Sequence, residues 1–315
     1  ICPEIWSWHT SLYGVIMLAN NNNINKKNYK MIIILKRLVL TVMIFFVFAN
    51  VQAETKKFNM VFVPASEKGD ESDYKSLISI VEKLTGFEIN TVKVTDYNAA
   101  VEAMRAGRAD IAWYGGKTYI KAAEIADAEA FAAGVRPGEK NANYFTYFVV
   151  KKDSKIKKFS DIKDKVLSLN TIGSTSGDLI PQVELTKINL STTNKDHFKN
   201  VFYAGSHDAC LLAVLNNHSD VCGMSSRNFE ARLADNTFKM EQVRIIHKSD
   251  PVPPPPLAYS KKILLDDRKK IKKAVLEAHK HGEIGGYGGK MSHYISVKDS
   301  DYDVLRKVVE LLKNK

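Results

Sequence analysis

The sequence predicts an α/β protein made of two units, each a mostly parallel sheet flanked by helices. Three observations lead to this prediction. From residue 58 onward, short β-branched and aromatic runs alternate with segments whose apolar residues recur at helical spacing. The alternation starts again after Lys151, and a proline run over residues 251–256 interrupts it near the C-terminal helices. The length of 315 residues suits one large domain or two small ones.

The first unit is expected over residues 54–150 and 250–315. Its strands are predicted at residues 58–63, 87–94, 109–113 and 144–151, and its first helices at 74–84, 96–106 and 118–126. Asp96 is the expected N-cap of the second helix, and glycines follow the first two helices as stop signals. Two amphipathic helices, at 266–280 and 302–312, flank a glycine-rich loop at 285–289. The order of strands and helices predicts a parallel sheet covered by helices.

The second unit is expected over residues 151–249, so the chain crosses between the units near Lys151 and again near Asp250. A short helix is predicted to begin at Ser160. Strands are expected at 166–169, 201–203, 220–224 and 243–246, with helices after residue 177 and at 207–217 and 226–235. The second unit therefore repeats the architecture of the first.

The N-terminal segments resemble processing sequences rather than folded structure. Residues 1–30 are rich in Asn and lack periodicity, so we interpret Met31 as the true start and the preceding residues as translated in error. Residues 31–53 combine early basic residues, an apolar run at 38–48 and a small-x-Ala end at Ala53, the pattern of a secretory signal peptide. A genuine N-terminal anchor is the alternative, although membrane helices need about 20 apolar residues.

Cleavage after Ala53 would give a periplasmic chain without a Cys at its new N-terminus, and therefore without a lipid anchor. Residues 1–53 hold five Lys or Arg and one Glu, so their removal lowers the net charge from +11 to +7. The remaining lysines are scattered among Asp and Glu, which does not indicate a nucleic-acid partner. Cys210 and Cys222 could pair in an oxidising compartment or remain buried thiols. Cys and His spacing predicts no metal site, and no cofactor is expected.

The most informative motif is Gly-Ser-Thr-Ser-Gly at residues 173–177, between a predicted strand and a predicted helix. Hydroxyls and backbone N–H groups at a helix N-terminus favour an anion, and glycines let a backbone approach a ligand closely. The motif is rich in hydrogen-bond donors and poor in carboxylates. It therefore suits an oxyanion such as phosphate, phosphite or a phosphonate, whereas an ordinary N-cap is the simpler alternative.

Five segments in matching order carry a family resemblance. They are Thr-Asp-Tyr at 95–97, Asp-Ile-Ala-Trp-Tyr-Gly at 110–115, residues 144–154, Gly-Ser-Thr-Ser-Gly at 173–177 with Pro181, and Gly-Ser-His-Asp-Ala at 205–209 with Ala-Val at 213–214. Together they resemble the phosphonate-binding proteins of ABC transporters, over roughly residues 58–263. The resemblance implies a two-lobed periplasmic binding protein of the type II fold, with the ligand in a cleft between the lobes and a membrane permease as partner.

The resemblance also implies roles for individual residues. The implied ligand-binding residues are Ser174, Thr175, Ser176 and His207 from one lobe, and Tyr97 and Tyr144 from the other. Tyr114 is a further candidate, more simply read as wall or core. A His at a helix start is expected to have a lowered pKa and to bind as a neutral donor.

Arg227 and Pro255 occupy positions where relatives specific for aminoalkylphosphonates place acidic residues for the ligand's ammonium group. We therefore expect an amine-free ligand: phosphate, phosphite, methylphosphonate or a carboxyl-bearing phosphonate. Arg227 would hold a second anionic group if it faces the ligand, or point to solvent.

Other classes of function remain open alternatives. Ser176, His207 and Asp208 could be drawn as a hydrolase triad, but no Gly-x-Ser-x-Gly elbow is present. The same fold could serve a sensor or chemoreceptor, or bind sulfate or selenate. The expectation is a monomeric binding protein without catalytic activity.

Overall fold

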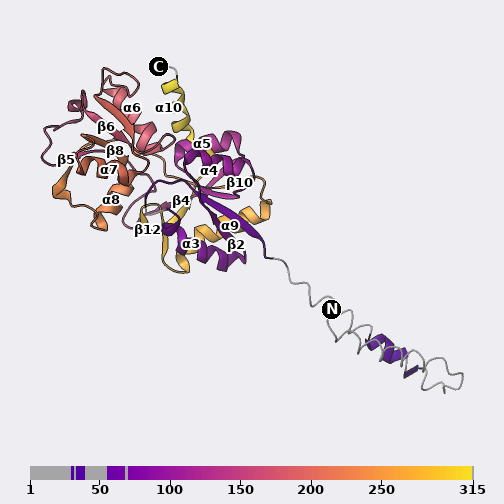
Figure 1. Ribbon diagram of the computed structural model, residues 1–315. Helices are drawn as coiled ribbons and strands as arrows, with labels where there is room; N and C mark the ends of the chain where they lie inside the picture. Colours follow the sequence, from indigo (N-terminus) through magenta and orange to yellow (C-terminus); the bar gives the residue numbers. More distant parts are fainter. Residues whose placement is uncertain (1–29, 32, 40–54, 68–69, 314–315) are drawn as a thin grey trace, which may run out of the picture. The chain divides into compact units, whose positions relative to one another are not determined.

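The computed structural model describes residues 30–31, 33–39, 55–67 and 70–313 (Figure 1). Residues 1–29, residues 40–48 of the apolar run and the expected cleavage site at Ala53 therefore lie outside the described residues. Residues 30–31 and 33–39 are helical. Among the described residues, no helix has both the length and the apolar character needed to cross a membrane. Residues 55–315 form one compact unit, within which two sheets define two lobes.

The first lobe is built on a six-stranded sheet with the order β13-β4-β10-β3-β1-β2. β1 pairs in parallel with β2 and β3, whereas β10 and β13 join antiparallel to their neighbours. The strands are β1 (Lys57–Phe62), β2 (Glu88–Val92), β3 (Ile111–Trp113), β4 (Ala128–Val135), β10 (Leu257–Ser260) and β13 (His293–Ser296). The helices are α3 (Asp70–Thr85), α4 (Tyr97–Arg105), α5 (Gly116–Ile125), α9 (Leu265–Glu277) and α10 (Asp303–Lys313). A hairpin of β11 (Ile284–Gly286) and β12 (Gly289–Met291) replaces the predicted glycine-rich loop.

The second lobe is built on a five-stranded sheet with the order β7-β6-β8-β5-β9. β6 is parallel to β7 and β8, and β5 is antiparallel to β8 and β9. The strands are β5 (Thr146–Lys151), β6 (Val166–Leu169), β7 (Asn200–Tyr203), β8 (Val221–Ser225) and β9 (Val243–Lys248). The helices are α6 (Ile180–Lys187), α7 (His207–Leu215) and α8 (Ser226–Ala234). α7 and α8 lie beside β5 and β8, as the labels in Figure 1 show.

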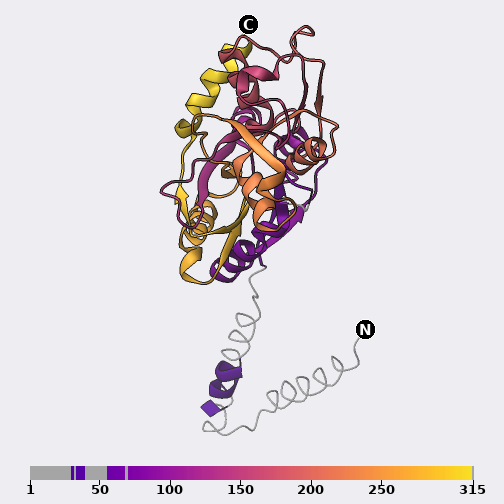
Figure 2. The same cartoon turned by 90° about the vertical axis from the view of Figure 1, so that its left-hand side faces the viewer.

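Short helical turns link several elements. They are η2 (Phe159–Ile162), η3 (Thr175–Leu179), η4 (Met240–Gln242), η5 (Ala278–Lys280) and η6 (Asp299–Tyr302). Both faces of the second sheet are covered, because successive strand residues point to opposite sides. Phe148 packs with Leu167 and Leu185 on one face, whereas the next residue, Val149, packs with Leu211 on the other. In the second view, the yellow C-terminal helix α10 lies near one end of the lobes (Figure 2).

The two-lobed α/β class predicted from the sequence is confirmed, but one boundary is wrong. The strand ending at Lys151 was expected in the first unit, whereas β5 pairs with β8 and β9 in the second sheet. The first crossing between lobes therefore precedes Thr146. A hydrophobic run identifies a strand but not the sheet it joins, because pairing is decided by distant residues.

Candidate functional site

The candidate site lies where the chain crosses between the lobes. Tyr144 and Val252, one on each crossing segment, form an antiparallel bridge with N···O distances of 3.2 and 2.8 Å. Tyr144 is only 3% exposed. Its side chain therefore lies inside the molecule, next to the backbone that joins the lobes.

The Ser-Thr-Ser motif forms a buried turn after β6. Ser174 is the N-cap of η3, and its Oγ accepts from the Gly177 N–H at 3.1 Å. Ser174, Thr175 and Ser176 are all nearly inaccessible to solvent. A Cβ at Gly177 would clash with Asn170 and would lie 2.8 Å from the His207 Cε1 atom. Glycine is therefore required for the motif to lie against the imidazole.

His207 begins α7 and is held by backbone from both lobes. Its N–H donates to the Ala65 carbonyl of the first lobe at 3.1 Å. Its Nδ1 accepts from the Ser225 N–H at 3.2 Å, and its Nε2 lies 3.5 Å from the Ser176 Oγ. Burial lowers the pKa of His207 to about 3. The imidazole is therefore neutral, and because Nδ1 accepts, the proton is on Nε2, facing Ser176.

Two tyrosines bring hydroxyls to the motif. Asn170 Nδ2 donates to the Tyr97 hydroxyl at 3.4 Å and to the Ser174 Oγ at 3.2 Å. Burial raises the pKa of Tyr144 to about 12, while hydrogen bonding with Ser176 and Thr175 and the nearby charge of Arg227 act in the opposite direction. The Tyr144 phenol is therefore neutral and can donate a hydrogen bond. We call Tyr97, Tyr144, Ser174, Thr175, Ser176 and His207 the interlobe site.

Further contacts join the lobes beside the motif, and the sequence did not indicate them. Lys117 Nζ forms a 2.6 Å ion pair with Asp178, and the Lys117 N–H donates to the Thr175 Oγ1 at 2.9 Å. The Thr118 hydroxyl donates to the Gly173 carbonyl at 2.9 Å. Asp178 also accepts from the Gly173 N–H, Gln182 and Tyr203. This buried carboxylate is therefore fully engaged within the protein.

The structure excludes a solvent-facing Arg227, which is 2% exposed. Its Nη2 donates to the carbonyls of Ala142 at 2.8 Å and Gly134 at 3.2 Å, and lies 3.4 Å from a Glu139 carboxylate oxygen. Tyr114 has a different position: its hydroxyl donates to the Ala100 carbonyl at 3.2 Å, inside the first lobe. The geometry thus gives Tyr114 a packing role and leaves Arg227 between the lobes.

The hydrolase triad considered from the sequence, Ser176, His207 and Asp208, is not assembled. His207 Nδ1 is occupied by the Ser225 N–H, and Asp208 instead accepts from the Glu67 N–H at 3.0 Å. In the described part of the chain, no cluster of three or more His, Cys, Asp or Glu could hold a metal ion. Cys210 and Cys222 form a disulfide, which resolves the alternative left open by the sequence.

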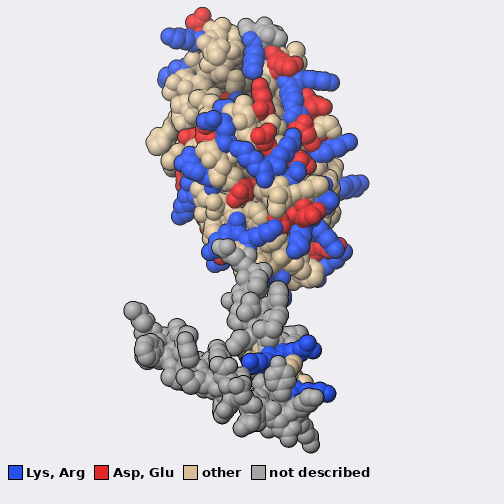
Figure 3. Space-filling view, turned by 90° about the vertical axis from the view of Figure 1, so that its right-hand side faces the viewer, with Lys and Arg blue, Asp and Glu red and all other residues tan. Residues whose placement is uncertain are grey.

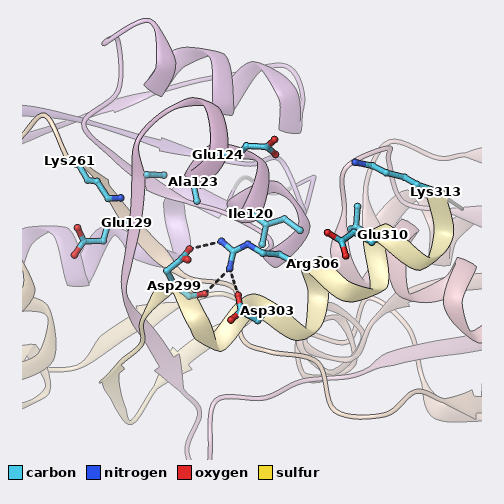
Figure 4. A pocket seen from close by; sticks show the side chains of 12 residues that line it. Ile120, Ala123, Glu124, Glu129, Lys261, Asp299, Asp303, Arg306, Glu310 and Lys313 are labelled. Carbon is cyan, nitrogen blue, oxygen red and sulfur yellow. Dashed lines mark hydrogen bonds and ion pairs between the residues drawn. The ribbon is translucent and has the colours of Figure 1, made fainter.

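A separate pocket of about 570 Å³ lies between α5 and α10 (Figure 4). Arg306 forms ion pairs there with Asp299 at 2.6 Å and Asp303 at 2.7 Å. Asp299 also accepts from the buried Tyr119 hydroxyl at 2.7 Å. The Tyr119–Asp299 hydrogen bond thus ties the segment before α10 to α5, and none of these residues belongs to the interlobe site.

The two sheets and the hydroxyl-rich site between them define a periplasmic binding protein of the type II class. The chain belongs to the family described as the periplasmic substrate-binding protein of phosphonate ABC transporters, whose model matches residues 60–302.

Curated relatives agree with this assignment. The chain is 27% identical over 229 residues to the phosphonates-binding periplasmic protein of Escherichia coli, covering 71% of this chain and 66% of that protein. It is 28% identical over 196 residues to the phosphate-import protein PhnD of Mycolicibacterium smegmatis, covering 60% and 61%. The alignments thus span slightly less than two thirds of these relatives.

Two solved structures share the fold. One is a binding protein component of an ABC phosphonate transporter from Pseudomonas aeruginosa, with TM-score 0.72, 23% identity, and 83% of this chain and 87% of that chain covered. The other is PhnD1 from Prochlorococcus marinus in complex with methylphosphonate, with TM-score 0.70, 18% identity, and coverage of 82% and 99%.

Proposed function

We propose that this protein is the solute-binding receptor of an ABC transporter and captures a small phosphorus oxyanion, a phosphonate, phosphite or phosphate, in the interlobe site. One observation carries the proposal: hydroxyls from both lobes and one neutral imidazole N–H lie buried beside one another. Hydrogen bonds from neutral donors to an oxyanion are charge-assisted and strengthen when water is excluded.

The donor set explains why the ligand is anionic. Ser174, Thr175, Ser176, Tyr97, Tyr144 and His207 each offer an O–H or N–H group. The nearby carboxylate of Asp178 is already engaged by Lys117 and its other partners. A tetrahedral anion can accept several such hydrogen bonds at once, whereas an ammonium group would find no carboxylate partner among these residues. The ligand is therefore amine-free.

Transport follows from capture through closure of the lobes. The contacts between Lys117 and Asp178 and between Thr118 and Gly173 join the two lobes beside the motif. A ligand that bridges the lobes stabilises this arrangement, and the closed form would dock on the membrane permease. The protein acts by binding, as a monomer without a catalytic step, in the periplasm after signal peptide cleavage near Ala53.

The charge distribution agrees with a small-molecule partner. On the face shown in Figure 3, carboxylates lie among the lysines and arginines. A nucleic-acid surface would instead gather basic residues in one stripe.

Titration calorimetry on residues 54–315, refolded once to remove carried ligand, tests the proposal. The ligands are phosphate, phosphite, methylphosphonate, 2-aminoethylphosphonate and sulfate. We expect tight binding of an amine-free phosphorus oxyanion and at least about tenfold weaker binding of 2-aminoethylphosphonate, a difference of about 1.4 kcal/mol. Binding of sulfate alone, or of no member, would contradict the proposal. Turnover of an activated ester would contradict the absence of catalysis.

A further inference from the structure

Two buried N–H donors lie beyond Tyr144 and are not explained by binding of the phosphorus oxyanion. Among the described residues, Arg227 Nε and Trp113 Nε1 have no hydrogen-bond partner. The two residues are 2% and 1% exposed. Buried N–H groups without a partner are rare in folded proteins, because each loses its hydrogen bond to water without replacement. An acceptor is therefore expected at this place.

Both donors border the same aromatic side chains. The ring of Trp113 lies 4.7 Å from that of Tyr287 and 5.8 Å from that of Tyr74. Gly288, next to Tyr287, packs against the Arg227 side chain, and a Cβ there would lie 3.0 Å from the Arg227 Cβ. Tyr144 joins this group to the motif, since its ring is 6.3 Å from Tyr287 and its hydroxyl bonds with Thr175 and Ser176.

The charge of Arg227 is only partly compensated. Its one ion-pair partner in the described residues is Glu139, at 3.4 Å, and the Glu139 side chain is 31% exposed. The two carbonyls that accept from its Nη2 carry partial charges only. Arg136, whose own ion pair is with Glu230 at 2.6 Å, adds a further positive charge nearby. A buried cation in this setting favours an additional anion.

We propose that the ligand carries a second acid group, bound by the Arg227 Nε–H with support from the Trp113 Nε1–H. This inference rests on the proposed function and narrows it to one class of substrate, the phosphonates with a short carboxylate-bearing arm. The phosphonate group occupies the Ser-Thr-Ser end of the site, and the carboxylate lies at the Arg227 end. An ammonium at the same end would be repelled.

Calorimetry with a graded set of ligands tests the inference on the mature chain. The set is phosphonoformate, phosphonoacetate, 3-phosphonopropionate, methylphosphonate and 2-aminoethylphosphonate. We expect one of the three carboxylated ligands to bind about tenfold or more tightly than methylphosphonate, as a charge-assisted contact implies. The preferred arm length then reports the distance between the two ends of the site.

Variants separate ligand recognition from structural support. In Arg227→Met, the preference for the carboxylated ligand should disappear, while methylphosphonate affinity changes by less than about threefold. In Trp113→Phe, the preference should shrink but persist, because the charge remains. Arg232→Met is the matched control, since it removes a cation and its ion pairs with Asp208 and Asp235 from the same helix, α8, and should leave the preference intact. Circular dichroism and thermal melting verify folding of each variant.

The outcomes distinguish the two proposals. If methylphosphonate binds and no carboxylated ligand binds more tightly, the inference fails and the proposed function stands. If Arg227→Met weakens all ligands equally, Arg227 only joins the lobes through Gly134 and Ala142, and the inference fails. If no phosphorus oxyanion binds the wild-type chain, the proposed function fails, and the inference fails with it.

Discussion

The two lobes contribute to the interlobe site in different ways. The second lobe supplies groups that its own backbone positions: Ser174 caps η3, and the Ser225 N–H sets the tautomer of His207. The first lobe supplies groups that reach the motif only across the interface, among them Tyr97 and Lys117. The comparison indicates that the second lobe is a preformed half-site, whereas the first lobe completes it when the lobes meet. Affinity and closure should therefore respond to different substitutions.

The largest effect is expected from disrupting the preformed half-site with Gly177→Ala. The new methyl group would clash with Asn170 and approach the His207 Cε1 atom at 2.8 Å, so the motif and the imidazole must separate. We expect affinity for the phosphorus oxyanion to fall by about 100-fold or more, together with about 1–3 kcal/mol of stability from overpacking. Calorimetry and thermal unfolding measure the two effects.

Gly107→Ala is the control for this substitution. Gly107 has a φ of +71° and no atom within 4 Å of its hypothetical Cβ, so alanine adds backbone strain without a clash. It should lower stability by about 1 kcal/mol and leave ligand affinity unchanged. Equal losses of affinity in both variants would show that general destabilisation, rather than the half-site, is responsible.

A smaller effect with a distinct pH signature is expected from His207→Gln. The pKa of His207 is about 3 when folded and 6.5 in the reference state, so the unfolded chain binds more protons between these values. Above pH 6.5 the imidazole is neutral in both the folded and the unfolded chain, so the free energy of unfolding does not depend on its titration. Below pH 6.5 only the unfolded chain takes up the proton, and the free energy of unfolding falls by up to about 1.4 kcal/mol per pH unit.

Urea unfolding from pH 4.5 to 8 should show this slope in the wild-type chain and a shallower one in His207→Gln. The amide of Gln retains a donor, so ligand affinity should fall by about tenfold rather than disappear. Identical pH profiles would mean that the imidazole is not held neutral by burial. An unchanged affinity would remove His207 from the site.

The smallest effect is expected from the lobe that completes the site. Lys117→Met removes the ion pair with Asp178, which keeps the Gly173 N–H, Gln182 and Tyr203 as partners. The ion pair forms only when the lobes are in contact, so its removal destabilises the closed form and leaves the open form unchanged. Affinity should therefore fall by about three- to tenfold, mainly through faster ligand release. Stopped-flow kinetics measure the release rate.

Lys121→Met is the matched control on the same helix, since Lys121 hydrogen-bonds to exposed Asn98 within the first lobe. It should leave the release rate unchanged. If Lys117→Met slows association and leaves release unaffected, the ion pair steers the ligand instead of holding the lobes together.

The sequence predicted the local structure of the second lobe's motif well because its signals are local. The Gly-Ser-Thr-Ser-Gly motif lies within one turn, and α7 begins at His207 as expected. Asp96 caps α4 and accepts from the Ala99 N–H, which was also predicted. Each of these features depends on residues within a few positions of one another, so chain pattern alone can reveal them.

The features missed by the sequence depend on distant residues. β4 was not predicted because its alanine-rich run has one β-branched residue, Val135, and its pairing with β10 and β13 supplies the stabilisation instead. The Lys117–Asp178 pair joins residues 61 positions apart. That Arg227 Nε and Trp113 Nε1 are buried without a hydrogen-bond partner is learned only from the folded structure. No spacing rule along the chain connects such groups.

The bridge between Tyr144 and Val252 lies on the two segments that connect the lobes, so a rotation of one lobe relative to the other would pivot close to it. Tyr144 belongs both to the backbone link between the lobes and to the interlobe site, so a ligand bound there as proposed would act close to this link. A rotation of one lobe about this link moves the surfaces farther from it by a greater distance. A permease that binds those outer surfaces would thus distinguish the ligand-bound receptor from the ligand-free one by a movement larger than the one at the ligand.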